Sequence, residues 1–145
     1  MIRKDIKNGR VRQVSNQLGH AYQITGKVVR GRQLGRTIGF PTINVSYGRQ
    51  LLPADGVYSV LVYHDGAFYP AMANVGTNPT VSDGSRRTLE AHIFDFDEDL
   101  YGQQVAVNFI DFIRKDRKFA SVSELTEQLK KDREAARQTL SDNLR

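Results

Sequence analysis

Between Tyr22 and Ile113, short runs of apolar and β-forming residues are separated by residues typical of turns. This spacing predicts an antiparallel barrel or sandwich. The turn His64-Asp65-Gly66 should join two of the strands as a hairpin, because Asp and Gly tolerate positive φ. Six strands are expected, at residues 22–29, 42–47, 57–64, 67–75, 88–96 and 105–113.

After Phe119 the apolar residues recur at helical spacing. Ser121 and Glu124 have the spacing of a capping box, which predicts the start of a helix. One C-terminal helix should therefore pack on the barrel through a single apolar stripe. That stripe consists of Leu125, Leu129, Ala136, Leu140 and Leu144.

The N-terminal residues also carry apolar side chains at helical spacing, with Gly9 and Gly19 as stops. Because these pieces are short, we expect them to form no core of their own. The apolar positions are Ile2, Ile6, Val14 and Leu18.

With 145 residues the chain fits one domain that buries an ordinary core. It contains no cysteine, no apolar run of transmembrane length and no secretory signal, so we expect a cytoplasmic protein without a membrane partner. The net charge is +5, and four of these charges lie in residues 1–20. Since no aromatic residues are interleaved with them, a solvated basic arm is favoured over a nucleic-acid site.

The stretch GRQLGRTIGFPTIN, residues 31–44, has the composition of a phosphate-binding loop. Its three glycines and Pro41 disfavour a helix, and glycines let backbone N–H groups converge on an anion. Arg32 and Arg36 would add positive charge. The stretch lacks both the Walker A and the GxGxxG pattern, and an ordinary surface loop would have the same composition.

Thr42 and Asn44 lie two residues apart on an expected strand, so their side chains share one face. Neutral oxygens of this kind complete a Mg²⁺ shell when ATP supplies most of the ligands. Local hydrogen bonding is the alternative role.

Glu90 is the candidate general base. In TLEAHIFDF, residues 88–96, side-chain alternation places Glu90 on one face of the strand with His92, Phe94 and Phe96. A carboxylate on a partly apolar face tends to have a raised pKa and can serve as a general base. An exposed strand glutamate is the alternative, and a structural role is favoured for His92.

Two further segments are candidates for the site. The stretch NVGTNPT, residues 74–80, predicts a tight turn. The stretch FIRKDRKF, residues 112–119, is either a segment that closes on a ligand or a charged connection.

Together these segments resemble riboflavin kinase, and in particular the kinase domain of bacterial bifunctional riboflavin kinase/FMN adenylyltransferase. The similarity covers about residues 22–140 and rests on GKVVRGRQLGRTIGFPTIN, LPADGVY, NVGTNPT, EAHIFDFDEDLYG and FIRKDRKF. It implies a six-stranded antiparallel Greek-key barrel with a C-terminal helix. It also implies transfer of the γ-phosphate of ATP to the 5′-hydroxyl of riboflavin, with Mg²⁺, to give FMN and ADP.

The resemblance assigns roles residue by residue. Glu90 matches the catalytic base, and Thr42 and Asn44 match the Mg²⁺–ATP contacts of the Pro-Thr-Ala-Asn motif. Ile43 replaces the usual alanine and should point away from the metal side, and Asp116 replaces the usual glutamate near the flavin. The implied ATP contacts are Gly31, Arg36, Gly39, Thr42, Asn44 and Asn74, and the implied flavin contacts are Arg114, Arg117 and Phe119.

Residues 1–20 resemble the tail of an adenylyltransferase domain, and residues 21–145 the kinase domain. The natural protein is therefore expected to carry an N-terminal FMN adenylyltransferase domain, whose paired-histidine signature this chain lacks, so FAD formation is not expected. Two alternatives stay open: a barrel that binds RNA through its basic arm and loops, and a flavin-binding module that no longer phosphorylates.

Overall fold

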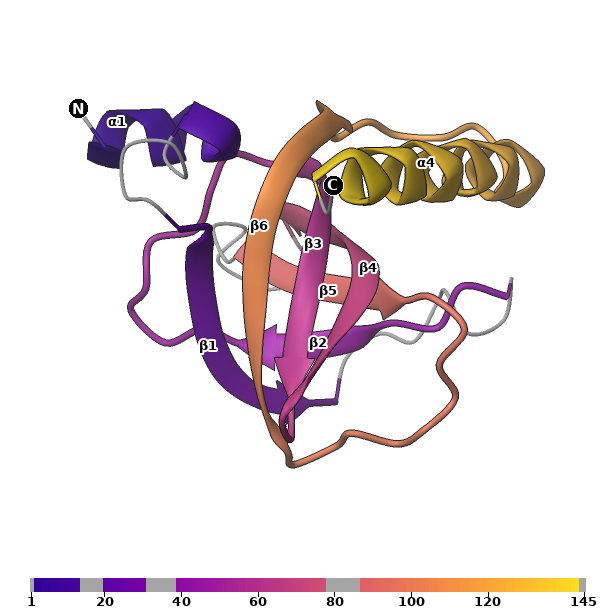
Figure 1. Cartoon of the computed structure of the whole chain (residues 1–145). Coiled ribbons are helices and arrows are strands. Elements are labelled where there is room, and N and C mark those ends of the chain that lie inside the picture. Colours follow the sequence, from indigo (N-terminus) through magenta and orange to yellow (C-terminus); the bar gives the residue numbers. More distant parts are fainter. Residues whose placement is uncertain (1, 14–19, 31–38, 78–86, 144–145) are drawn as a thin grey trace.

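Antiparallel strands close into a barrel, and a long helix lies across its outer face (Figure 1). The computed structural model describes residues 2–13, 20–30, 39–77 and 87–143. The elements in these ranges are α1 (Ile2–Lys7), β1 (Tyr22–Val29), β2 (Ile43–Ser46), β3 (Gly56–His64), β4 (Ala67–Thr77), β5 (Arg87–Ile93), β6 (Gln104–Lys115) and α4 (Val122–Asn143). All six predicted strands and the C-terminal helix are confirmed, with shifts at their ends.

The strand order around the barrel is β1-β2-β5-β4-β3-β6. Strands β3, β4 and β5 follow one another as neighbours, and β2 lies beside β5, which is a Greek-key arrangement. The β3–β4 hairpin turns at Asp65 and Gly66, which have φ of 49° and 87°. The predicted hairpin and the predicted Greek-key barrel are both confirmed.

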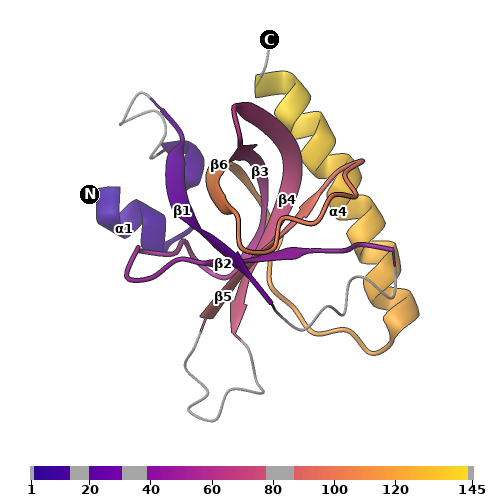
Figure 2. The ribbon, with the colours of Figure 1, turned by 90° about the horizontal axis from the view of Figure 1, so that it is seen from below.

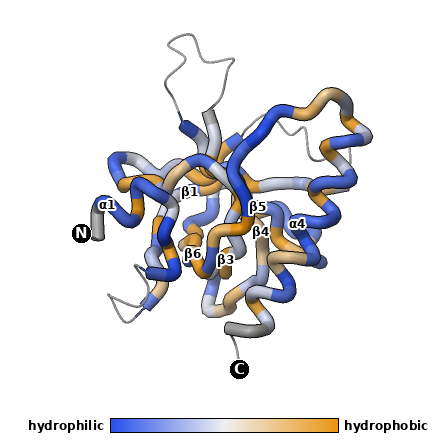
Figure 3. Tube along the Cα trace, turned by 90° about the horizontal axis from the view of Figure 1, so that it is seen from above, coloured by the Kyte–Doolittle hydropathy of each residue, from blue (hydrophilic) through white to orange (hydrophobic). Residues whose placement is uncertain are grey.

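The interior of the barrel is filled by apolar side chains that alternate along the strands. The hydropathy colouring in Figure 3 shows hydrophobic segments among the strands, whereas much of α4 is hydrophilic. The largest fully buried apolar side chains include Ile24, Val60, Leu89 and Phe109. Tyr58 is also fully buried, and its hydroxyl donates a hydrogen bond of 2.6 Å to the carbonyl of Ala54.

A second apolar cluster fixes α4 to the outer face of β3, β4 and β6 (Figure 2). Its buried members are Phe40, Val57, Met72, Phe94, Ala136 and Leu140. The helix begins as predicted, because the backbone N–H of Glu124 donates to Ser121 Oγ at 3.1 Å.

Strand β6 is longer than predicted and continues to Lys115. Its pairing with β3 shifts register twice, and the skipped residues are Ile110 and Ile113, both packed against the α4 cluster. Such bulges insert an extra residue and turn the strand. Arg114 therefore lies near the end of β6, one residue beyond the predicted end of this strand at Ile113.

Two other strand ends differ from the prediction. β5 ends at Ile93, and a positive φ of 52° at Asp95 turns the chain, so Phe96 packs against the interior cluster beside Tyr69 instead of sharing the face of Glu90. β4 extends to Thr77, two residues beyond its predicted end at Val75, so Gly76 and Thr77 belong to a strand where a turn was expected. Residues 78–80 of that predicted turn lie outside the described residues.

The described N-terminal residues are anchored to the barrel. α1 ends before Gly9, whose φ of 77° fits the predicted stop. Ile6 is only 4% exposed, and Val11 is fully buried in the interior cluster. Arg12 also donates to Asp111 of β6 at 2.8 Å. The segment forms no core of its own, as expected, but it adds Val11 to the core of the barrel, which the sequence pattern did not predict. Val14 and Leu18 lie outside the described residues.

None of the helices within the described ranges combines the length and the apolar character needed to cross a lipid bilayer.

Candidate functional site

Three of the predicted site residues lie side by side on neighbouring strands. Asn44 of β2 is opposite Glu90 of β5, and Glu90 is opposite Asn74 of β4. Directly opposed residues on antiparallel strands have Cβ atoms about 4.5–5.5 Å apart on the same face. The row continues through Val57 of β3 to Arg114 of β6. Barrel closure thus collects residues that are far apart in the sequence.

Thr42 joins this row from the segment before β2. Its hydroxyl donates a hydrogen bond to Glu90 Oε1 at 3.2 Å. A threonine hydroxyl that donates its one proton retains oxygen lone pairs for another partner. Thr42, Asn44 and Glu90 are all half-buried, so they form a polar group at the wall of a cleft.

His92 holds the backbone that precedes Thr42. Its Nδ1 lies 2.7 Å from the carbonyl oxygen of Pro41, so this nitrogen carries the proton and donates. The Phe40 ring lies edge-on to His92, and the Arg133 guanidinium lies 5.0 Å from the centre of the same phenyl ring. Burial lowers the pKa of His92, and the positive charge of Arg133 acts in the same direction. The structural role expected for His92 agrees with these contacts.

Ile43 faces the opposite way. Its side chain packs against the interior cluster, on the side of its cross-strand partner Ala91. The expectation that Ile43 points away from the side of Thr42 and Asn44 is confirmed.

A cleft of about 1300 Å³ opens over the polar row. One wall carries Thr42, Asn44 and Glu90, and the lining also includes the buried Val57 and Met72. The other wall is formed by residues from the end of β6 to the start of α4, and it includes Arg114, Arg117, Phe119, Leu125 and Leu129. The polar and the basic-aromatic walls therefore face one shared space.

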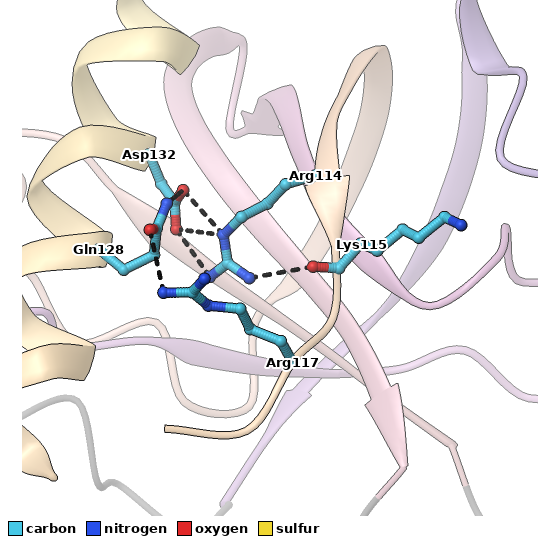
Figure 4. Close-up of polar contacts among 5 residues, drawn as sticks. All are labelled: Arg114, Lys115, Arg117, Gln128 and Asp132. Atoms are coloured by element: carbon cyan, nitrogen blue, oxygen red, sulfur yellow. Dashed lines mark hydrogen bonds and ion pairs between the residues drawn. The ribbon is translucent and has the colours of Figure 1, made fainter. Parts of the chain in front are cut away.

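The basic-aromatic wall is fixed to α4 by a network of polar contacts (Figure 4). Arg114 donates to Asp132 through Nε at 2.9 and 3.0 Å and through Nη2 at 2.9 Å. Gln128 donates to Asp132 at 2.9 Å and accepts from Arg117 at 3.4 Å. The centre of the Phe119 ring lies 5.5 Å from the Cζ atom of Arg114 and 4.7 Å from that of Arg117.

Asp116 lies over β4 at the edge of this wall. A Cβ atom added at Gly76 would come within 3.0 Å of Asp116 Oδ2, so the missing side chain of Gly76 gives the carboxyl group its space. Burial raises the pKa of Asp116, and the negative charge of Asp55 adds to the increase.

Seven of the predicted site residues line one cleft. On its polar side these are Thr42, Asn44, Asn74 and Glu90, and on its basic-aromatic side the predicted flavin contacts Arg114, Arg117 and Phe119. Gly39 is exposed and has a φ of 85°, a conformation that favours glycine. Gly31 and Arg36 lie outside the described residues.

Sequence reasoning missed Asp132, which is 1% exposed and accepts from Arg114. A signal was present, because Asp132 follows Leu129 by three residues and precedes Ala136 by four. These intervals place a charged residue within the apolar stripe of α4. A charge in such a position predicts a buried partner.

Comparisons with known proteins show the family and the fold to which the chain belongs. A family model described as riboflavin kinase (flavokinase) matches residues 18–140. The bifunctional riboflavin kinase/FMN adenylyltransferase of Haemophilus influenzae is 43% identical over 94% of this chain, but the match covers 44% of that protein. The chain thus spans about half the length of the curated relatives it matches.

Two solved structures share the fold. A crystal structure described as a macrolide-efflux protein from Streptococcus pneumoniae matches with a TM-score of 0.88 and 44% identity, over 94% of this chain and 45% of that one. The riboflavin kinase of Trypanosoma brucei matches with a TM-score of 0.60 and 25% identity, over 82% of this chain and 79% of that one. From the matching family model and these relatives, the chain belongs to the riboflavin kinase family.

Proposed function

We propose that this chain transfers the γ-phosphate of ATP to the 5′-hydroxyl of riboflavin, forming FMN and ADP. The observation that carries the proposal is the row Asn44, Glu90 and Asn74, with Thr42 bonded to Glu90, at the wall of one large cleft. A carboxylate beside neutral oxygen donors is suited to activating a hydroxyl group next to a nucleotide. Family membership supports the same substrates.

Glu90 would accept the proton of the riboflavin hydroxyl as its oxygen attacks the γ-phosphorus. The P–O bond to ADP breaks as the new P–O bond forms, and the proton passes to the carboxylate. The hydrogen bond from Thr42 orients Glu90 Oε1. His92 supports the same geometry by holding the carbonyl of Pro41, one residue before Thr42.

The residues around Glu90 fit a magnesium ion carried by ATP. Mg²⁺ prefers oxygen ligands and commonly takes only one or two from the protein when phosphates supply others. Thr42 and Asn44 offer a hydroxyl and a carboxamide oxygen, and Thr42 directs its proton to Glu90, which leaves its lone pairs for the ion. When bound, the ion would neutralise charge on the phosphate groups. Asn74 is placed to contact the nucleotide from the other side of Glu90.

The basic-aromatic wall would take the flavin. Phe119 offers a ring for a planar ligand, and Arg114 and Arg117 border that ring. We propose that these three residues contact riboflavin, while the expected contacts of Gly31, Arg36 and Gly39 with ATP stay predictions.

We also propose that this chain forms FMN but not FAD, because the printed sequence lacks the paired-histidine signature of the adenylyltransferase. The cytoplasmic location, the tail-like nature of residues 1–20 and the attached adenylyltransferase domain of the natural protein stay predictions.

One assay tests the proposed function. The protein is incubated with riboflavin, ATP and Mg²⁺, and flavins and nucleotides are separated by chromatography. We expect FMN and ADP in equal amounts, and none of either when EDTA removes the metal. Bound riboflavin without ADP would identify a flavin-binding module instead. RNA binding that weakens steeply with salt, without FMN formation, would identify the other alternative.

A further inference from the structure

Asp132 of α4 lies directly behind the basic-aromatic wall. Its side chain is 1% exposed and accepts three hydrogen bonds from Arg114 and one from Gln128 (Figure 4). Among the described residues, Arg114 and Arg117 line the cleft, whereas Asp132 and Gln128 do not. Asp132 therefore reaches the cleft only through the arginines.

Attachment of α4 to the barrel does not explain this buried charge. Ala136 and Leu140 already bury the helix against the barrel, with Leu129 packed beside them. A buried ion pair is an inefficient way to add stability, because removing two charges from water offsets much of their attraction. What the pair adds is geometry, since two parallel N–H···O contacts define both the position and the plane of a guanidinium group.

We propose that Asp132 is a positioning residue that sets the flavin-side wall of the cleft by orienting Arg114 directly and Arg117 through Gln128. This inference rests on the proposed function, in which that wall receives riboflavin. It assigns α4 a part in flavin affinity that goes beyond packing on the barrel.

The position of Asp132 makes its effect selective. Along the row of paired residues, β4 and β3 separate Arg114 from Glu90, and Asn44 lies on the far side of Glu90. A shift of Arg114 therefore changes the flavin wall and leaves the polar wall in place. A general loosening of the fold would affect both substrates.

The test compares Michaelis constants for the two substrates. Asp132→Asn keeps the shape of the side chain but removes its charge, so Arg114 loses its ionic partner. We expect the Michaelis constant for riboflavin to rise about tenfold, the loss of roughly one charge-assisted contact. The constant for ATP should stay at the wild-type value. Glu134→Gln, an exposed carboxylate on the same helix, is the matched control and should change neither constant.

A double-mutant cycle shows whether Asp132 acts through Arg114. In an Arg114→Gln background, Asp132→Asn should raise the riboflavin constant by a much smaller factor than in the wild type, because only the contact through Gln128 to Arg117 remains. Circular dichroism checks that each variant is folded. If Asp132→Asn does not fold, Gln128→Met decides, because it keeps the buried ion pair and should raise only the riboflavin constant, to a smaller extent.

Where Asp132→Asn folds, any of three results would overturn the inference: an unchanged riboflavin constant in that variant, equal increases for riboflavin and ATP, or additive effects in the cycle. An unchanged riboflavin constant in Gln128→Met would overturn it where that variant decides. If the wild-type protein forms no FMN, the proposed function fails and the inference fails with it. If the wild-type protein forms FMN and Asp132→Asn has the same kinetic constants as the wild type, the proposed function stands and only the inference about Asp132 is refuted.

Discussion

At the scale of single residues, Glu90 is defined by its neighbours. It receives a hydrogen bond from Thr42 and lies between Asn44 and Asn74 on the flanking strands. A strand glutamate in isolation gives no sign of catalysis. The proposed role of Glu90 as a base depends on this polar row and on the cleft above it.

Replacement of Glu90 by glutamine tests that role. Glutamine preserves the size of the side chain and an oxygen for Thr42 but cannot accept the substrate proton. We expect kcat to fall about 10²–10⁴-fold, with the affinity for Mg²⁺–ATP nearly unchanged. Steady-state kinetics and nucleotide titration measure the two effects, and exposed Glu98→Gln is the control. A kcat close to wild type would exclude Glu90 as the base.

His92 makes the stability of the fold depend on pH. Burial holds its pKa below the ordinary value of 6.5, so the unfolded chain takes up a proton at a higher pH than the folded chain. The stabilising effect of neutral, buried His92 is therefore full above pH 6.5 and is lost as the pH falls through the lowered pKa of the folded state.

Thermal unfolding between about pH 7.5 and about pH 5 measures this dependence. We expect the melting temperature of the wild type to decrease toward acid more steeply than that of His92→Gln. His20→Gln, which removes an exposed histidine, should behave like the wild type. Identical slopes for the wild type and His92→Gln would contradict the prediction.

At the scale of elements, local sequence patterns predicted which helices and strands exist better than they predicted where these elements end. Ser121 caps α4 as its spacing with Glu124 predicted, because capping depends on residues within one turn. The end of β6 was missed, because its bulges at Ile110 and Ile113 arise from pairing with β3 and packing against α4.

Removal of the cap tests how α4 is stabilised. Ser121→Ala leaves the backbone N–H of Glu124 without its side-chain acceptor, so we expect a loss of about 1 kcal/mol in the free energy of unfolding. Urea denaturation measures the loss. Ser123→Ala, an exposed change in the first turn of the same helix, should cost less. Equal effects of the two substitutions would argue against the cap.

At the scale of the whole molecule, the N-terminal segment contributes a buried side chain to the core of the barrel. Val11 is fully buried in the interior cluster, and Arg12 pairs with Asp111 of β6. The charges of α1 are exposed at Lys4 and Lys7, so the segment combines a polar surface with an apolar anchor.

Val11→Ala measures the strength of this anchor. The loss of buried methyl groups and the cavity left behind should lower the free energy of unfolding by about 2 kcal/mol. Val29→Ala, at a position 39% exposed, is the control and should cost clearly less in urea denaturation. If Val11→Ala were as stable as the control, the segment would not contribute to the core.

The sequence by itself determined the six strands, the Asp65-Gly66 hairpin, the helix with its Ser121 cap and the motifs that resemble the riboflavin kinase family. These features depend on periodicity and on neighbours within a few residues, so they can be read locally. Tertiary structure decided which strands pair, and thereby placed Asn44, Glu90 and Asn74 in one row. It also decided that Val11 closes the core and that Asp132 holds Arg114. Barrel closure and helix docking set these contacts, because they join residues that no local pattern relates.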